Sequence, residues 1–313
     1  MICKNIETYQ VKSPIVFIVF NRPEVTQQVF NIIRKSQPKK LYLISDGPRK
    51  DKPNDESLCQ KVRDIVCNID WECDVKKNFS EENLGCGVRV SSGISWVFEN
   101  EDKAIIIEDD VLPSLKFFQF CDEMLDRYEN NKTIAQISGA NLQNITYTPD
   151  SYFISKYSAI WGWATWKRAW KGYSQKLENW ECERKNNHIA DIFNKSEWLE
   201  LRYKIDLIKA GDLNTWDYQW DYHRLKQNGY NIFPKKNLIK NLGLGSGTHT
   251  NKMNNQLNDL AIDDLDFPLD HPADLTPCNI FDKQYYERMV KTPFLNKLKF
   301  RTKTFLKKLL GSP

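Results

Sequence analysis

Residues 104–110 read AIIIEDD, so four consecutive apolar residues stand directly before the acidic triplet Glu108, Asp109 and Asp110. An apolar run this short suits a buried strand of a parallel sheet better than a buried helix. Unpaired charge is too costly to bury, so we expect the strand to end at the triplet and deliver it to an edge of the sheet. Ligands of open α/β sheets bind at that edge, outside the carboxyl ends of the strands.

Strand and helix patterns alternate on both sides of this stretch. The apolar patterns predict strands over 14–20, 41–45, 73–77 and 134–138, and helices over 24–35, 56–67, 88–98 and 115–128. This alternation predicts an α/β fold with a doubly wound, mostly parallel sheet. The first two strands also end in polar residues, around Arg22 and Asp46, and parallel strands bring such ends to one crevice.

The periodicity weakens after about residue 140. Residues 151–157, 230–234 and 237–240 resemble strands, 196–210 and 216–227 resemble helices, and 160–166 form a compact aromatic segment. A glycine-rich loop covers 242–250, and residues 251–285 are polar and irregular. We therefore expect an α/β half over 1–140, a second α+β half of the same domain over 141–250, an irregular wrap over 251–290 and a tail over 291–313.

Positive charge is concentrated in that tail. The 313-residue chain has a net charge of +4, yet residues 291–313 contain seven Lys and Arg and no acidic residue. Their apolar residues fall near one helical face, which predicts a basic amphipathic helix that binds an anionic membrane surface. A solvated helix face is the plainer alternative. The small total charge argues against a nucleic-acid partner.

Cysteine spacing and apolar runs set expectations about location. The chain has eight cysteines without a CxxC pair, so neither a zinc knuckle nor a thioredoxin-like motif is expected. No apolar run approaches the roughly 20 residues that span a bilayer, and residues 1–12 are too polar for a signal peptide. We expect reduced thiols and a cytoplasmic protein, peripheral on the inner face of the membrane through its tail.

The predicted strand ends bring one cation and four carboxylates together. Arginine can neutralise phosphate, a carboxylate can accept from a base N–H or a ribose hydroxyl, and a divalent metal ion can bridge a diphosphate to a carboxylate. This set of groups therefore suits a nucleotide. Each feature also has a plainer reading: a solvated loop for the triplet, an ordinary turn at Asp46 and a surface position for Arg22.

Segments 16–23, 43–48, 83–96 and 104–118, in this order, resemble the glycosyltransferases of the GT-A (Rossmann-like) fold. Residues 105–118, IIIEDDVLPSLKFF, are particularly similar to the N-acetylglucosaminyltransferase I family, in which an acidic triplet replaces the more usual Asp-x-Asp. The similarity continues more loosely to about residue 250. There Thr248-His249 resembles the end of a late glycine loop in bacterial family-two-like sugar transferases.

The resemblance implies transfer of a hexosyl or N-acetylhexosaminyl group from a nucleotide-diphosphate sugar, a UDP sugar in particular. The acceptor would be a glycan or a lipid-linked molecule in surface polysaccharide or glycolipid assembly, and the cofactor Mn²⁺ or Mg²⁺. Arg22 would contact the nucleotide or its diphosphate, and Arg89 would approach the phosphates. Asp46 would accept from the uracil ring, and Glu108 and Asp109 would face the sugar and the ribose of the donor.

Three further residues complete the site that the resemblance implies. Asp110 would be the main protein ligand of the metal ion. Asp217 would be the catalytic base of an inverting transfer, because the family's base lies in a similar Trp-Asp setting, and Asp221, one helical turn later, is the competing candidate. His249 would bind the diphosphate or the metal. Of the three tryptophans in 160–166, we expect Trp163 to line the sugar pocket and the other two to lie in the core.

Two other functions stay open. A nucleotidyltransferase would also bind a nucleotide on such a sheet, but it would usually have a glycine-rich first loop followed by basic residues. Residues 21–24 read NRPE and contain no glycine, which counts against it. A non-catalytic carbohydrate-binding protein is the other alternative, if the tryptophans matter and the carboxylates do not.

Overall fold

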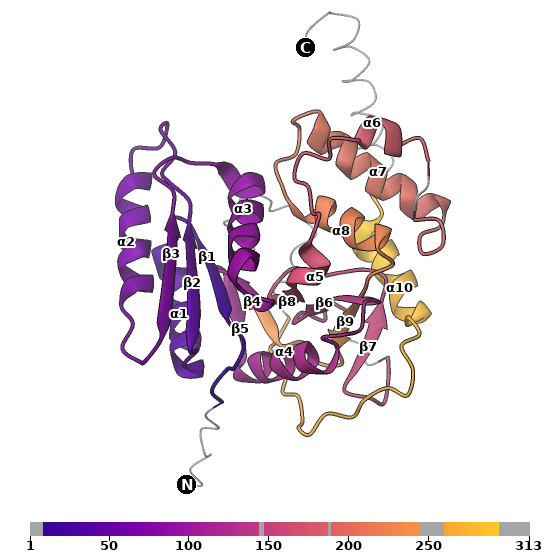
Figure 1. The fold of residues 1–313 in the computed structure, drawn as a ribbon, viewed down its shortest axis with the longest axis horizontal. Coiled ribbons are helices and arrows are strands. Elements are labelled where there is room, and N and C mark those ends of the chain that lie inside the picture. Colours follow the sequence, from indigo (N-terminus) through magenta and orange to yellow (C-terminus); the bar gives the residue numbers. More distant parts are fainter. Residues whose placement is uncertain (1–8, 144–146, 187–188, 244–259, 294–313) are drawn as a thin grey trace, which may run out of the picture.

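The computed structural model describes residues 9–143, 147–186, 189–243 and 260–293. One eight-stranded sheet runs through this part of the chain, in the order β3-β2-β1-β4-β8-β6-β9-β7 (Figure 1). Its strands are β1 (Ile15–Val19), β2 (Lys40–Ser45), β3 (Asp74–Phe79), β4 (Lys103–Glu108), β6 (Ile134–Ser138), β7 (Tyr152–Ser155), β8 (Trp163–Trp166) and β9 (Tyr230–Pro234). A second, two-stranded sheet pairs β5 (Val111–Pro113) with β10 (Ile239–Asn241).

The large sheet is mostly parallel, as the sequence predicts. β3, β2, β1 and β4 pair in parallel, and so do β6 and β9. β8 is antiparallel to both of its neighbours, β4 and β6, and β7 is antiparallel to β9. The parallel strands β1, β2 and β4 therefore end at one edge, where the predicted polar residues follow them.

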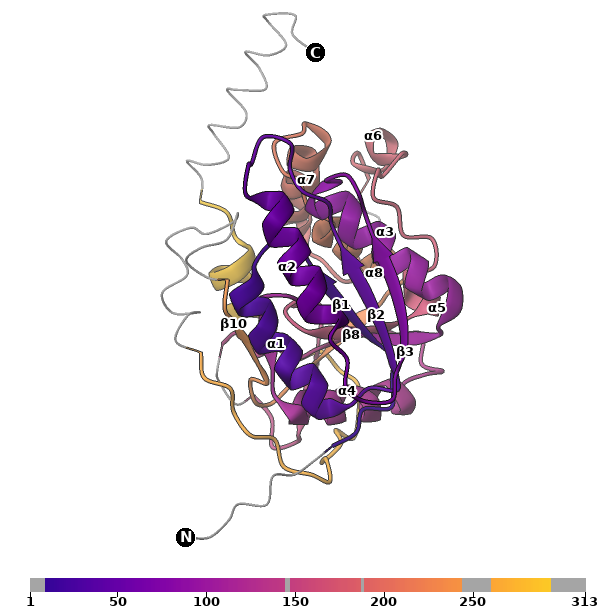
Figure 2. The same cartoon turned by 90° about the vertical axis from the view of Figure 1, so that its left-hand side faces the viewer.

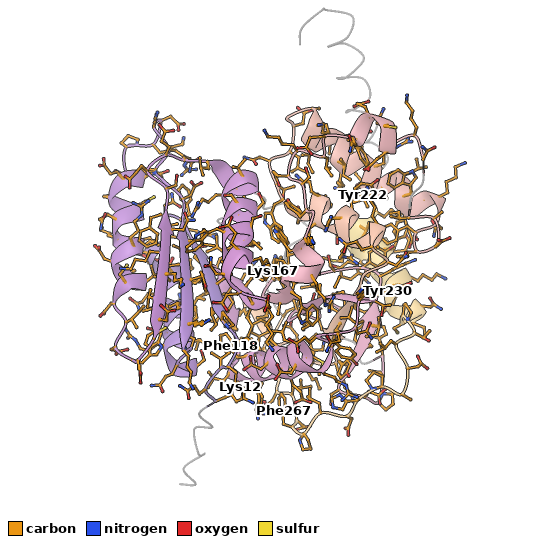
Figure 3. All side chains as sticks on the ribbon, viewed as in Figure 1. Lys12, Phe118, Lys167, Tyr222, Tyr230 and Phe267 are labelled. Carbon is orange, nitrogen blue, oxygen red and sulfur yellow. The ribbon has the colours of Figure 1, made fainter. Side chains whose placement is uncertain are left out.

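Helices cover both faces of the parallel strands, so the fold is doubly wound (Figure 2). Side chains of β1 alternate between the faces: Phe17 packs in one hydrophobic cluster and Val16 in the other. The first cluster includes residues of α1 (Pro23–Ser36), α2 (Asp55–Cys67) and α4 (Leu115–Arg127); the second includes residues of α3 (Gly85–Asn100). Side chains fill the layer between α4, where Phe118 is labelled, and the strands (Figure 3).

The ends of two of these helices follow from local sequence signals. Pro23 is the first residue of α1, where its fixed φ fits and its missing N–H is not needed. Ser114 caps α4, because its hydroxyl accepts from the N–H of Phe117 at 3.1 Å. These signals place α1 and α4 directly after the strand ends that carry Arg22 and the triplet.

The second half completes the same sheet. Its helices are α5 (Lys167–Trp170), α6 (Trp180–Glu183), α7 (Lys195–Lys209), α8 (Asp217–Lys226), α10 (Asn279–Tyr285) and the π-helix η2 (Tyr286–Val290). The aromatic segment contains a central strand, β8, which the sequence did not predict. The expectation that residues up to 285 are irregular is wrong for α10, whose Phe281 and Tyr285 are buried against the core.

Two predicted features lie outside the described residues: most of the glycine-rich loop at 242–250, with His249, and most of the basic tail at 291–313. Across the described residues, no helix is both long and apolar enough to cross a membrane.

Candidate functional site

The acidic triplet and Arg22 meet at the carboxyl ends of β4 and β1. Arg22 follows β1, and its guanidinium donates to Asp110 Oδ2 at 2.7 Å and to Asp109 Oδ1. The N–H of Phe20 donates to the other oxygen of Asp109 at 3.2 Å. Burial alone would lower the pKa of Arg22, but the two carboxylates raise it above its usual range, so the guanidinium stays charged. The structure thus brings together the groups that the sequence placed at these two strand ends.

Glu108 is the member of the triplet with which no described cation pairs. Among the described residues no ion pair reaches it, whereas Arg22 holds Asp109 and Asp110. Burial and the neighbouring Asp110 and Asp109 raise the pKa of Glu108 to about 8, although Arg22 acts in the opposite direction. Three carboxylates facing one arginine leave negative charge that a divalent cation would offset.

The donor set fits a metal ion that shares its ligands with a substrate. Within the described part of the chain, no three His, Cys, Asp or Glu side chains are arranged to hold a metal by themselves. Mg²⁺ is usually bound by one or two carboxylates together with substrate phosphates and water. Asp110 fits this pattern because it is half-buried at a strand end and lies beside another carboxylate. Its role as the metal ligand stays a prediction.

Asp46 follows β2 and orders a loop. Its Oδ1 accepts from the N–H groups of Gly47 and Leu84, both at 2.9 Å. Its Oδ2 accepts from the N–H of Gly85 at 3.0 Å and from the amide of Asn83 at 3.1 Å. A carboxylate offers about four lone-pair sites, and these donors use all of them. Acceptance from uracil therefore stays a prediction that the observed hydrogen bonds disfavour.

Arg89 is buried in α3 on the β3 side of the site. Its Nη2 donates to the carbonyl and to Oδ1 of Asn78, the latter at 2.9 Å, and its Nε is buried with no acceptor among the described residues. Burial lowers its pKa, while Asp46 acts in the opposite direction. Its observed partners thus belong to β3 and not to the triplet, and its approach to phosphate stays a prediction.

The two candidate bases differ in their partners. Asp217, the first residue of α8, accepts from the hydroxyl of Thr215, and no cationic side chain in the described ranges pairs with it. Burial raises the pKa of Asp217, although this hydrogen bond acts in the opposite direction. Asp221 instead accepts at Oδ1 from the hydroxyl of Ser158 at 2.5 Å, and from Nη2 and Nε of Arg224 at 2.8 and 3.0 Å. An ion pair with Arg224 holds Asp221, whereas Asp217 has no cation among the described residues, so the geometry favours Asp217 as the base.

Asp217 also lies within electrostatic reach of the triplet. Its charge contributes to the raised pKa of Glu108, and it contributes likewise at Cys86, at the start of α3. Asn214, in the segment before α8, binds the start of α3, because its Oδ1 accepts from the N–H of Gly87 at 3.1 Å. Arg22 at the end of β1 thus pairs with the triplet at the end of β4, and Asp217 contributes to the electrostatic environment of the triplet from the second half of the chain.

A cavity of about 300 Å³ adjoins Asp217. Its walls come from residues 157–161, α7, α8 and the turn from α10 into η2, and include Trp161, Leu201, Tyr218 and Tyr285. This cavity could not be predicted from the sequence, because its walls come from segments that are far apart along the chain.

The expectation that Trp163 lines the sugar pocket is wrong. Trp163 is fully buried on the central strand β8 and stacks on Trp216 with ring centroids 5.4 Å apart. Trp161 precedes the strand, is half-buried and lines the cavity. Both faces of a central strand are covered, so only the tryptophan outside it can face a ligand.

Comparisons with known proteins add little to this geometry. No protein-family model matches the chain, and no curated protein does. Similar solved structures include UDP-glucose pyrophosphorylase complexed with UDP-glucose, at 9% identity over 74% of this chain and 94% of that chain, with a TM-score of 0.38. HddC from Yersinia pseudotuberculosis matches at 10% identity, 53% and 83% coverage and a TM-score of 0.32. Apo mouse xyloside xylosyltransferase 1 matches at 8% identity, 68% and 81% coverage and a TM-score of 0.34. At these scores the likeness assigns neither a family nor an activity.

Proposed function

We propose that the chain is a metal-dependent, inverting glycosyltransferase of the GT-A fold that uses a nucleotide-diphosphate sugar, in particular a UDP sugar. The observation that carries the proposal is the convergence of Arg22 and the acidic triplet at the ends of β1 and β4, with Asp217 within electrostatic reach from α8. A cation and carboxylates at this edge of a parallel sheet suit a diphosphate and a divalent metal ion.

Each residue of the site has a distinct task in the proposed reaction. Arg22 binds the diphosphate of the donor, while Glu108 and Asp109 accept from hydroxyls of its sugar and ribose. Asp110 holds Mn²⁺ or Mg²⁺, which when bound offsets the charge that develops on the departing diphosphate. Asp217 takes the proton of the acceptor hydroxyl as that oxygen attacks the anomeric carbon. Burial keeps the pKa of Asp217 raised, which suits a base.

The two alternative functions, nucleotidyl transfer and carbohydrate binding without catalysis, predict different reaction products. A nucleotidyltransferase would release pyrophosphate from UTP and a sugar phosphate, and a binding protein would release nothing. The turn between β1 and α1 contains no glycine, and its Arg22 is engaged with two carboxylates, which disfavours a phosphate-cradling first loop.

Product release tests the proposal. The protein is incubated with UDP and GDP sugars, with Mn²⁺ or with a chelator, and released nucleoside diphosphate is measured. We expect UDP release that requires metal and is lost in Asp110→Ala. Asp51→Ala is the matched control, because Asp51 is an exposed carboxylate on the loop before α2. Pyrophosphate release from UTP, or no response to any nucleotide sugar, would overturn the proposal, and equal turnover with the chelator would overturn metal dependence.

We propose further that the acceptor is a glycan or a lipid-linked molecule in surface polysaccharide or glycolipid assembly, reached at a membrane through residues 291–313. The support is the charge pattern of that segment, with seven cations and no acidic residue. Flotation with anionic liposomes, with and without residues 291–313, tests the membrane contact, and equal flotation of both proteins contradicts it.

A further inference from the structure

The cavity beside Asp217 has no assigned ligand, and we propose that it is the acceptor site and takes a terminal sugar ring that stacks on Trp161. This inference rests on the proposed function, which places the base at Asp217, and it adds where the acceptor binds and which of its groups enters the site. A peptide hydroxyl and an alkyl alcohol are the competing classes.

Trp161 is the first reason to expect a sugar. Among the described residues it has no ring–ring contact, and its indole N–H meets no acceptor. The rings of Trp163, Trp170, Trp216 and Trp220, by contrast, contact one another. Trp161 is half-buried in the wall of the cavity. An indole that offers an apolar face and one donor suits a sugar ring, which has a C–H face edged by hydroxyl acceptors.

The pair Asp217 and Asp221 is the second reason. Both line the cavity, and they lie one turn apart on α8, a spacing that puts side chains on the same helical face. The donors to Asp221 all reach Oδ1, and within the described ranges none reaches Oδ2. Two neighbouring carboxylates match a ligand with two hydroxyls, one delivered to the base and one held by Asp221. A serine side chain or a simple alcohol offers only one.

The size and lining of the cavity limit the ligand further. A volume of about 300 Å³ is at the small end of ligand pockets, which suits the terminal residue of an acceptor better than a folded segment. Most of its lining is apolar, with Leu201, Met289 and Val290 beside the aromatic side chains. The last two belong to η2, and π-helical turns occur frequently at functional sites.

Saturation-transfer NMR with the full chain tests the inference. The probes are the methyl glycosides of glucose, galactose, mannose and N-acetylglucosamine, with N-acetylserine methylamide and propanol as single-hydroxyl compounds. We expect at least one glycoside, and neither single-hydroxyl compound, to bind. Trp161→Ala should weaken that binding by about 5- to 10-fold. Trp161→Phe should retain most of it, and Trp71→Ala is the matched control, because Trp71 is a half-buried indole that packs on Phe30 outside the cavity.

Two separate titrations distinguish failure of this inference from failure of the proposed function. No glycoside binding at millimolar concentrations, or equal binding by wild type and Trp161→Ala, would overturn the sugar site even if UDP sugars bind with metal. Glycoside binding that depends on Trp161, without any binding of nucleotide sugars, would instead overturn the transferase and with it the role of the cavity as an acceptor site.

Discussion

Substituting Gly243 by alanine should displace the predicted metal ligand. Gly243 follows β10, where the N–H of Leu242 donates to the carbonyl of Asp110 at 2.7 Å. A Cβ on residue 243 would lie 2.1 Å from Oδ2 of Asp110 and 2.9 Å from Nη1 of Arg22, whereas ordinary contact begins near 3.4 Å. The carboxylate or the loop must therefore shift by about 1 Å or more. Either shift disturbs the contact between Arg22 and Asp110.

The size of that shift sets the expected effect on activity. A misplacement of about 1 Å in an active site can lower the rate on the order of 100-fold, so we expect kcat/KM for the UDP sugar to fall by about that factor in Gly243→Ala. The assay is steady-state UDP release at saturating Mn²⁺, with the Tm of the protein alone as the control for folding. If kcat/KM stays within a small factor of wild type and the Tm is unchanged, the overlap is relieved without moving Asp110, and the reasoning is refuted.

Three further predictions concern carboxylates. Asp217→Asn should lower the rate of sugar transfer by about 10²- to 10⁴-fold, and Asp221→Asn should lower it by less. Because burial raises the pKa of Asp217, the acid limb of the pH–rate profile of the wild type should lie above the usual carboxylate range. Asp55→Asn should lower the free energy of unfolding near pH 7 by about 2 kcal/mol, because hydrogen bonds from Arg49 lower the pKa of Asp55 from 3.8 to about 2. That stabilisation is lost as the pH falls through this pKa, so urea unfolding at falling pH should show the difference from wild type shrinking. Asp282 should behave in the opposite way: burial raises its pKa from 3.8 to about 6, so its contribution to stability is lost as the pH rises between these values. Asp282→Asn should flatten that dependence, and unchanged slopes in urea unfolding would contradict the prediction.

The first half of the fold could be predicted because β1, β2 and β4 are short, mostly apolar runs that polar residues end. Strand β8 could not, because its four residues, WATW, show no polar–apolar alternation that would separate them from an aromatic core segment. Its central position depends on pairing with β4 and β6, which are distant in sequence. The wrong expectation for Trp163 has the same origin, since exposure to the crevice depends on the strand order.

The role of Asp46 could not be predicted for a different reason. Its position after β2 follows from the apolar pattern, and the structure places it there. Three of its four hydrogen-bond donors are backbone N–H groups, two of them from Leu84 and Gly85. Backbone donors have no signature in the sequence, because every residue except proline carries one. A strand-end carboxylate that orders a loop therefore looks the same in sequence as one that binds a ligand.

The charged groups are paired differently in the two halves of the site, and this difference favours Asp217 over Asp221 as the proposed base. In the first half, a single cation, Arg22, pairs with both Asp109 and Asp110, and the negative charge that it leaves uncompensated suits a metal ion. In the second half, Arg224 is fully buried and pairs with Asp221. Asp217 is thereby left without a cation among the described residues, in an environment that raises its pKa. The buried guanidinium of Arg224 therefore separates the two candidates, because it pairs with Asp221 and not with Asp217.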